Sequence, residues 1–278
     1  MEISEDQTKT PDHAYLEAII CWRQKHNKEQ AIKLLDQALN LHITQTKTSQ
    51  SNIDFYIRLS ADFLLQLAQE YLVHCGTKPI SSNQSVPKHL IKATKLLENV
   101  TKQNQGLTEA QVLLAKSKWL ANDQTASLKE LHDCLEKDPT MVEAHILAAI
   151  INSECGNMKA ADHNLQQAFA QDFSIRENPV FMLMRSDVEI RGQDWENALK
   201  TLEAAFNLPQ VQDPSFSPEM TGLKKYSLPY GQPERARIFL NLIKVYCEVK
   251  NFEKAKKLMS RSISEFQGTP EEVKVMLA

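Results

Sequence analysis

The residues of this chain that could bind a metal ion are its eight histidines and five cysteines. Their densest grouping is His132 and Cys134, with His145 following further on. A zinc site uses several such ligands at short, regular spacings, and no second pair lies at such a spacing here. Cys134 also falls on a small position of the helical pattern described below, and a free cysteine packs as a small apolar residue. We therefore interpret all five cysteines as small core residues and expect no metal ion and no cofactor.

Sequence motifs of known catalytic mechanism are missing from the chain. We find no Gly-x-Ser-x-Gly nucleophile elbow, no glycine-rich phosphate loop and no His-Glu-x-x-His metal motif. A serine, a histidine and an aspartate can be chosen from any chain of 278 residues, so their presence does not indicate a catalytic triad. The sequence therefore predicts a protein that is not an enzyme and has no catalytic residues.

Composition and charge further restrict the kinds of partner and location that this protein can have. The chain has 32 lysines and arginines against 35 aspartates and glutamates, a formal net charge of −3, which favours neither nucleic acid nor an anionic membrane as a partner. Its apolar runs are far shorter than the roughly 20 residues that span a bilayer, and its N-terminus lacks an apolar signal segment. Its cysteines are odd in number and scattered, which suits reduced thiols. We expect a soluble, cytoplasmic protein with no nucleic-acid partner and no direct membrane insertion.

A three-point pattern recurs six times along the chain: a small residue, an apolar residue four positions later, and a small or apolar residue three positions after that. Three successive copies end at Val100, Cys134 and Ala168, at intervals of 34 residues. This period and pattern are typical of the tetratricopeptide repeat (TPR), a helix-turn-helix unit that stacks into a solenoid. The six copies are Ala31/Leu35/Ala38, Ala93/Leu97/Val100, Ser127/Leu131/Cys134, Ala161/Leu165/Ala168, Ala198/Leu202/Ala205 and Ala255/Met259/Ser262.

The repeats predict an all-α fold, a right-handed α-solenoid of about six TPR helix-turn-helix repeats that forms a single domain over residues 1–278. Two inserts rich in proline, glycine and polar residues cannot continue a helix, and we expect both to be mobile surface loops. A partial seventh repeat at the C-terminus predicts an excerpt of a longer array, or a partner at that end. The expected repeats cover residues 12–44, 53–105, 108–141, 142–175, 178–209 and 236–268, with inserts at 75–87 and 210–234 and the partial repeat at 269–278.

Local signals predict where several helices begin and end. Thr10 followed by Pro11 is a plausible N-cap and first-turn proline, and Thr140–Glu143 has the pattern of a capping box. Gly156 is expected to end a helix in the left-handed conformation. The first helix of the second repeat is expected from about Ile53 to His74.

The concave groove of a TPR solenoid is the usual peptide site, so we identify the positions expected to line it. TPR domains that clamp the C-terminal carboxylate of chaperones place asparagine and lysines along the first helices of neighbouring repeats. No asparagine stands at the equivalent positions here, which argues against such a clamp. Two of them are isoleucines, which either form apolar walls for a partner helix or loop or pack against neighbouring repeats. The six positions are Ile20, Gln69, Lys116, Ile150, Ser186 and Lys244.

Three stretches of the sequence go beyond the generic repeat: Leu96–Ala148, Asp172–Pro209 and Glu265–Ala278. Their most specific features are "DF-x-(I/V)-R-x-x-P" followed by "AL-K-T-L", then a proline-rich insert and "EF-x-GT-x-EEV". In these features the chain resembles the middle of the tetratricopeptide repeat protein 21 family, the large repeat subunit of the intraflagellar transport A complex.

The resemblance implies a non-enzymatic scaffold that supports retrograde ciliary transport and ciliary protein trafficking. Its implied partners are other subunits of the intraflagellar transport A complex and, as a second class, ciliary membrane cargo adaptors. Its implied location is the cytoplasm, the axoneme of the cilium or flagellum, and the basal body. The family supplies no catalytic residues. The alternative is a generic cytosolic TPR adaptor that binds short peptides, as a co-chaperone does.

Overall fold

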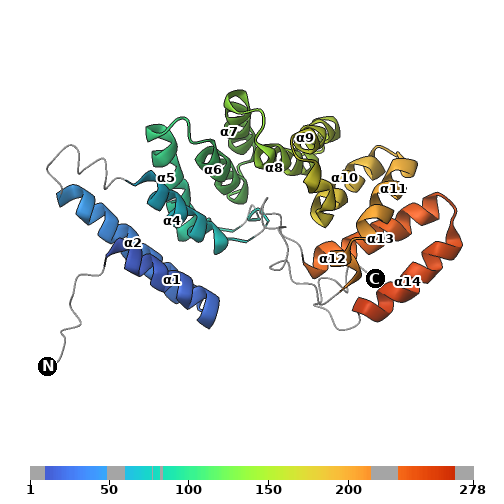
Figure 1. The fold of residues 1–278 in the computed structure, drawn as a ribbon, viewed down its shortest axis with the longest axis horizontal. Coiled ribbons are helices and arrows are strands. Elements are labelled where there is room, and N and C mark those ends of the chain that lie inside the picture. The colour runs from blue at the N-terminus through green and yellow to red at the C-terminus, as the bar shows by residue number, and fades with distance from the viewer. Residues whose placement is uncertain (1–9, 49–59, 77, 82–83, 214–230, 267–278) are drawn as a thin grey trace. The chain divides into compact units, whose positions relative to one another are not determined.

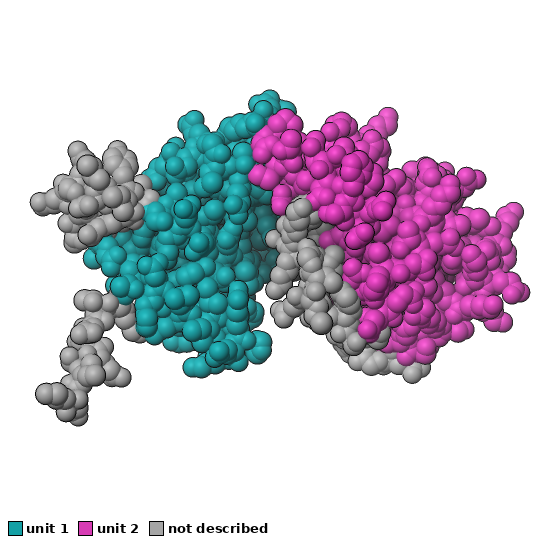
Figure 2. Space-filling view, viewed as in Figure 1, with its two compact units in different colours: residues 1–137 teal, residues 138–278 magenta. Residues whose placement is uncertain are grey.

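A computed structural model describes residues 10–48, 60–76, 78–81, 84–213 and 231–266 of the chain (Figure 1). Every regular element among these residues is a helix, which confirms the predicted all-α fold. None of these helices is long and apolar enough to cross a membrane. The chain divides into two compact units, unit 1 at residues 1–137 and unit 2 at residues 138–278 (Figure 2). The single domain predicted over residues 1–278 stays a prediction.

Unit 1 consists of two-helix hairpins, in which each helix packs against the next along the chain. The pairs are α1 with α2, α4 with α5, and α6 with α7; α2 also contacts α4, and α5 contacts α6. The first three copies of the small-residue pattern are fully buried on the second helices of these hairpins. Their bounds are α1 (Pro11–Lys25), α2 (Lys28–Thr48), α4 (Ala61–Val73), α5 (Lys88–Gln103), α6 (Thr108–Leu120) and α7 (Gln124–Lys137).

Unit 2 repeats this plan with α8 against α9, α10 against α11, and α13 against α14. A short 3-10 helix, η1, contacts both α9 and α10, and α11 contacts α13 across the junction between successive hairpins. The bounds are α8 (Val142–Glu154), α9 (Met158–Gln171), η1 (Phe173–Glu177), α10 (Pro179–Arg191), α11 (Trp195–Phe206), α12 (Pro209–Gln212), α13 (Gln232–Glu248) and α14 (Phe252–Phe266).

The last copy of the pattern needs a correction of register. Met259, predicted as its core residue, is 49% exposed, whereas Leu258 is 7% exposed and takes the core position between Ala255 and Ser262. Residues three and four positions after Ala255 both lie near its face of the helix. The spacing alone therefore could not decide between them, and packing against α13 did.

Two of the predicted helix signals are confirmed. Thr10 is the N-cap of α1 and its hydroxyl accepts a hydrogen bond from the His13 backbone N–H (3.2 Å), with Pro11 in the first turn. Gly156 follows α8 with a φ of +82°, a conformation that costs glycine little because it has no Cβ.

The capping box predicted at Thr140 is wrong. Met141 is the N-cap of α8, and no side chain caps that helix end. The Thr140 hydroxyl instead donates to the Asp138 carboxylate (2.6 Å), which also accepts from the Thr140 backbone N–H (3.0 Å). These two hydrogen bonds lower the pKa of Asp138. The Thr140 side chain therefore forms a local turn with Asp138 and does not cap the start of α8.

The helix predicted from Ile53 to His74 is not continuous, because Ser60 interrupts it. Ser60 has an extended backbone and its hydroxyl accepts from the Phe63 N–H (3.1 Å), so α4 starts at Ala61 and not near Ile53. Residues 49–59 lie outside the described part of the chain.

The inserts are only partly the loops that we predicted. Within insert 75–87, the Ile80 N–H donates to the Leu120 carbonyl (3.0 Å), so this segment satisfies a carbonyl at the end of α6. At insert 210–234, helix α12 covers the first residues and α13 already begins at Gln232. Residues 77, 82–83 and 214–230 lie outside the described residues, as does the partial seventh repeat predicted at 269–278.

Candidate functional site

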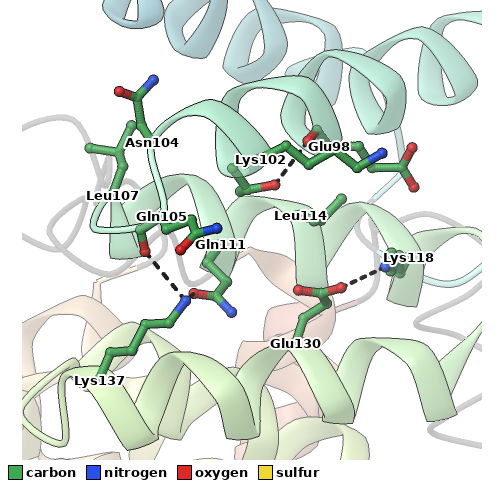
Figure 3. Close-up of a pocket in the computed structure, with 11 residues that line it drawn as sticks. Glu98, Lys102, Asn104, Gln105, Leu107, Gln111, Leu114, Lys118, Glu130 and Lys137 are labelled. Atoms are coloured by element: carbon green, nitrogen blue, oxygen red, sulfur yellow. Dashed lines mark hydrogen bonds and ion pairs between the residues drawn. The ribbon is translucent and has the colours of Figure 1, made fainter.

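A groove of about 410 Å³ lies in unit 1, where α5, α6 and α7 meet (Figure 3). Its volume falls within the range of ligand-binding clefts, roughly 300–1,000 Å³. None of its eleven lining residues carries an aromatic ring and only two are apolar, so hydrogen bonds and charge dominate its chemistry. The lining consists of Glu98, Thr101, Lys102, Asn104, Gln105, Leu107, Gln111, Leu114, Lys118, Glu130 and Lys137.

One end of the groove is closed by an ion pair. The Lys118 Nζ on α6 lies 2.8 Å from the Glu130 Oε1 on α7, and both side chains are largely buried. Gln111, Leu114 and Lys118 follow one another at spacings of three and four residues, so a single face of α6 supplies all three to the groove.

The other end of the groove holds a lysine that has no anionic partner among the described residues. The Lys137 Nζ donates to the Gln105 carbonyl (3.3 Å) and to the Gln111 Oε1 (3.1 Å), as Figure 3 shows. Both acceptors are neutral. An ammonium group has three N–H donors, so a third donor and the whole positive charge remain available to a ligand.

The α5 wall adds two opposite charges, Glu98 and Lys102, one helical turn apart. Thr101 lies between them, and its hydroxyl is occupied by the Leu97 carbonyl (2.9 Å). The lining as a whole therefore has three lysines against two glutamates. Among these eleven residues there is no histidine or cysteine, so the groove suits binding of polar groups rather than nucleophilic chemistry.

Unit 2 contains a junction built from the same repeat positions, where α11, α13 and α14 meet. Positions of α6 and α7 recur 128 residues later in α13 and α14, and positions of α5 recur 105 residues later in α11. Large apolar side chains stand there instead of polar ones, and they pack into the core of unit 2. The matched pairs are Thr101/Phe206, Gln111/Phe239, Lys118/Tyr246 and Glu130/Leu258.

An arginine clasp completes the closed junction of unit 2. Arg235 is 3% exposed, and its Nε donates to the Val211 carbonyl (2.7 Å). Its guanidinium lies 5.2 Å from the ring centroids of Phe239 and Phe266, the distance of a cation–π contact, and forms an ion pair with Glu265. We call Arg235, Glu265, Phe239 and Phe266 the arginine clasp.

The acid of the clasp occupies the repeat position that Lys137 occupies in the groove. Glu265 also forms an ion pair with Arg261. Burial would raise the pKa of Glu265, but the hydrogen bonds from Arg261 and Arg235 outweigh it and hold that pKa below its ordinary value. The clasp therefore supplies both charges itself, whereas the Lys137 end of the groove supplies only the cation.

A tyrosine closes two of the junctions between hairpins. In unit 1, the buried Tyr71 of α4 donates to the Asp36 carboxylate of α2 (2.7 Å), which also pairs with Lys92 of α5 (2.6 Å). Burial, followed by the hydrogen bond to Asp36, raises the pKa of Tyr71. The same repeat positions in unit 2 hold Tyr246, Glu203 and Lys254, joined by contacts of 2.7 and 3.0 Å.

At the junction that forms the groove this tyrosine is absent. Its position is taken by Lys118, and the position of the carboxylate by Glu98. A lysine side chain has no ring to fill the space, and Lys118 pairs with Glu130 at the next hairpin instead. The groove therefore arises from the local sequence: it has polar residues at positions where the junctions containing Tyr71 and Tyr246 have aromatic or aliphatic ones.

The six positions predicted to line a concave groove differ in exposure and in their contacts. Ile150 packs against the core of unit 2, as the packing interpretation expects, whereas Ile20 is 50% exposed, and its role as an apolar wall for a partner stays a prediction. Ser186 is buried and its hydroxyl donates to the Leu183 carbonyl (2.7 Å). The other three positions are Gln69, which donates to Glu109 (3.0 Å), Lys116, whose pKa burial lowers, and the exposed Lys244.

The three residues considered for a metal site each have another partner. His132 is exposed beside Glu136, and the buried Cys134 thiol contacts the Thr108 carbonyl (3.7 Å). The ring nitrogens of His145 lie 3.2 Å from the Asn164 Oδ1 and 3.0 Å from the Pro139 carbonyl. Within the described residues, no three side chains of histidine, cysteine, aspartate or glutamate are placed to hold a metal ion.

The interpretation of the cysteines as core residues is confirmed for some of them and wrong for others. None of the five forms a disulfide; Cys21 and Cys134 are buried and Cys75 is half-buried, and burial raises the pKa of Cys75 to about 11. Cys155 and Cys247 are exposed. Both lie near the C-terminus of a first helix, outside the small-residue pattern that indicated burial.

Sequence reasoning missed the groove, although a signal for it was present. Aligning the six copies of the pattern shows polar residues at Thr101, Gln111, Lys118 and Glu130, where the last hairpin has apolar ones. A polar residue at a core position of a repeat indicates either an exposed junction or a binding site.

Solved structures with the same fold define the class of protein. Pseudomonas aeruginosa PilF superposes with a TM-score of 0.57 at 12% sequence identity, covering 93% of this chain and 95% of that one. YrrB, described as a TPR protein with an unusual peptide-binding site, gives a TM-score of 0.52 at 11% identity, covering 74% of this chain and 86% of that one. Together with the hairpins, these likenesses show a TPR-like helical repeat array.

The family follows from the sequence comparisons. Residues 1–156 match the tetratricopeptide repeat protein 21 second ARM domain, and residues 173–278 match the tetratricopeptide repeat protein 21 ARM repeat. Human tetratricopeptide repeat protein 21B is 30% identical and mouse tetratricopeptide repeat protein 21A 27% identical, each over 277 residues that cover 100% of this chain. The chain belongs to the tetratricopeptide repeat protein 21 family, and it spans 21% of the length of these two relatives.

Proposed function

We propose that this chain is part of a non-enzymatic scaffold that binds other subunits of the intraflagellar transport A complex. The observation that carries the proposal is membership of the tetratricopeptide repeat protein 21 family together with the TPR-like hairpins. The resemblance that links this family to retrograde ciliary transport supplies the cellular setting: cytoplasm, basal body and axoneme. Ciliary membrane cargo adaptors are a second class of partner.

The mechanism is burial of partner surface on helix faces and in junctions between hairpins. Affinity in such interfaces depends on a few well-packed anchor residues rather than on total area. The groove in unit 1 is suited to an anchor of this kind because it is polar and presents the Lys137 cation.

The test is affinity purification of the full-length parent protein from ciliated cells, followed by identification of the bound subunits. We expect recovery of the other subunits of the transport complex, with a smaller yield when Ala161 is replaced by arginine. Ala161 lies on α9 and is fully buried. Ala170→Arg, at an exposed site on the same helix, is the matched control and should leave the yield unchanged. Recovery of chaperones without transport subunits would establish the alternative, a generic TPR adaptor.

A further inference from the structure

We infer that the groove between α5, α6 and α7 binds an extended acidic segment of a partner protein, with an aspartate or glutamate side chain of that segment seated against Lys137. The inference rests on the proposed function in one respect, that the occupant is a protein. Beyond the proposed function, it specifies the binding site, the acidic character of the bound segment and the residue, Lys137, that recognises it.

The first step is that the groove is a deviation from the pattern of the repeat. At the matched junction of unit 2, Phe206, Phe239 and Tyr246 fill the space and Leu258 covers it. Thr101, Gln111, Lys118 and Glu130 stand at those positions in unit 1 and leave about 410 Å³ open among the described residues. Polar residues at core positions lower stability, and such deviations concentrate at functional sites.

The second step is the charge at the end of the groove. In the clasp, the acid Glu265 neutralises Arg235. The position of Glu265 is Lys137 in the groove, and that of Arg235 is Leu107, so the charge pair is reduced to a cation with neutral acceptors. A carboxylate from a partner would form a charge-assisted hydrogen bond with the third N–H of Lys137, which is stronger than a neutral one.

The third step is the choice of ligand class. Asn104, Gln105 and Gln111 line the Lys137 end, and side-chain amides both donate to and accept from a peptide backbone. At the opposite end Glu130 neutralises Lys118 and Glu98 adds a further carboxylate, so the groove lacks the row of unpaired cations that the closely spaced phosphates of a nucleic acid require. One cation beside neutral amides, with carboxylates further along, fits a peptide with a single acidic residue.

The experiment selects random octapeptides displayed on phage against the chain of 278 residues, and against two variants of it. Lys137→Met removes the charge and keeps the apolar stem. Lys129→Met, at an exposed site elsewhere on the same helix, is the matched control. We expect the wild type and the control to enrich peptides with an internal aspartate or glutamate, and Lys137→Met to lose that enrichment.

The enriched peptide is then measured by fluorescence anisotropy as a C-terminal amide, with its acidic residue present or changed to the matching amide. We expect Lys137→Met to weaken binding about three- to tenfold, as for a partly exposed charge pair. The same loss should follow from the amide peptide, and the two losses should not add. Lys137→Arg should retain binding, and Gln111→Phe, which fills the groove, should abolish it.

Four outcomes would overturn the inference. The first two are the absence of any enriched acidic peptide and a loss of enrichment with Lys129→Met equal to that with Lys137→Met. The other two are additive losses of affinity when Lys137→Met is combined with the amide peptide, and binding that requires a free C-terminal carboxylate. Circular dichroism and thermal unfolding of each variant identify a loss of binding caused by misfolding, and the amide peptide tests the same contact on the wild type. Co-purification of transport subunits by the parent protein is a separate result, so the proposed function and this site can fail independently.

Discussion

The two matched junctions show how one repeat pattern produces a closed core in one place and an open groove in another. Between α11, α13 and α14, aromatic rings surround a buried arginine whose charge is neutralised from within the chain. Between α5, α6 and α7, the equivalent positions are polar and a lysine charge is left without an acid. The small residues that hold each hairpin together are buried in both. The hairpin and the junction are therefore specified by different residues.

The units also differ in how they bury polar groups. Unit 1 buries His42 against the ring of Phe63 and His74 against that of Trp22, with centroid distances of 5.0 and 4.9 Å. Burial lowers the pKa of both histidines, so they are held neutral. Unit 2 buries the charged Arg235 and stabilises it with an acid and two rings. The two solutions respond differently to mutation and to pH.

The largest effect is expected when the closed junction is made to resemble the open one. Phe239→Gln removes a fully buried ring and introduces an amide, so we expect a loss of about 4 kcal/mol in the free energy of unfolding of unit 2. Urea denaturation followed by Trp195 fluorescence, in a background with Trp22 and Trp119 changed to phenylalanine, measures it. A loss below about 1 kcal/mol would mean that the ring does not hold this junction closed.

Removing the arginine of the clasp should cost somewhat less. Arg235→Ala leaves the Val211 carbonyl without its donor, while Glu265 keeps Arg261, and we expect a loss of about 3 kcal/mol. The matched control is Arg237→Ala, because Arg237 is partly exposed and pairs with Asp187 at the surface. That control should lose less than about 1 kcal/mol in the same assay. Equal losses for the two variants would show that burial of Arg235 is unimportant.

A buried small residue should be equally sensitive in both units, since the hairpins share their packing. Ala93→Arg in unit 1 and Ala161→Arg in unit 2 each force a long charged side chain between two helices, and we expect losses of about 2 kcal/mol or more. Thermal unfolding followed by circular dichroism measures both, with Ala170→Arg as the exposed control. An unchanged melting temperature for either variant would show that its repeat register is wrong.

Acidification should destabilise unit 1 at a higher pH than unit 2. This is the smallest expected effect, a change of the order of 1 kcal/mol in the free energy of unfolding. The folded-state pKa values of His42 and His74 lie below their ordinary value of 6.5, so the unfolded chain binds more protons as the pH falls through this range. Unit 1 should therefore lose stability as the pH falls through 6.5 and below it. Unit 2 depends on Glu203 and Glu265, whose pKa values lie below 4.5, so it should hold until the pH falls below that value.

The measurement is urea denaturation at a series of pH values, with tryptophans retained in one unit at a time. His74→Phe should reduce the pH dependence of unit 1, and His132→Phe, at an exposed site, should leave it unchanged. Glu70 has a raised pKa because it is partly buried, so its protonation opposes part of this loss as the pH falls toward 4.5. Parallel pH profiles for the two units would contradict this difference in the pH dependence of their stability.

Much of the fold could be predicted because hairpin packing depends on short-range spacing. Ala161, Leu165 and Ala168 lie on one face of a helix whatever its neighbours are, so their burial follows from the sequence alone. Where two residues compete for one face, as Leu258 and Met259 do, the sequence pattern left the choice open. Thr140 shows the same limit, because a nearby aspartate competed for its hydroxyl.

The sequence by itself determined the helical class, the hairpin pattern and the family, since each depends on residue types at fixed intervals along the chain. Only the tertiary structure decided which junctions are open, because a junction collects residues from three helices. Lys137 meets Gln105 and Gln111, and Arg235 meets Val211 and Glu265, across separations that no local period relates. Whether a charge there is neutralised depends on side chains that meet only when the hairpins stack.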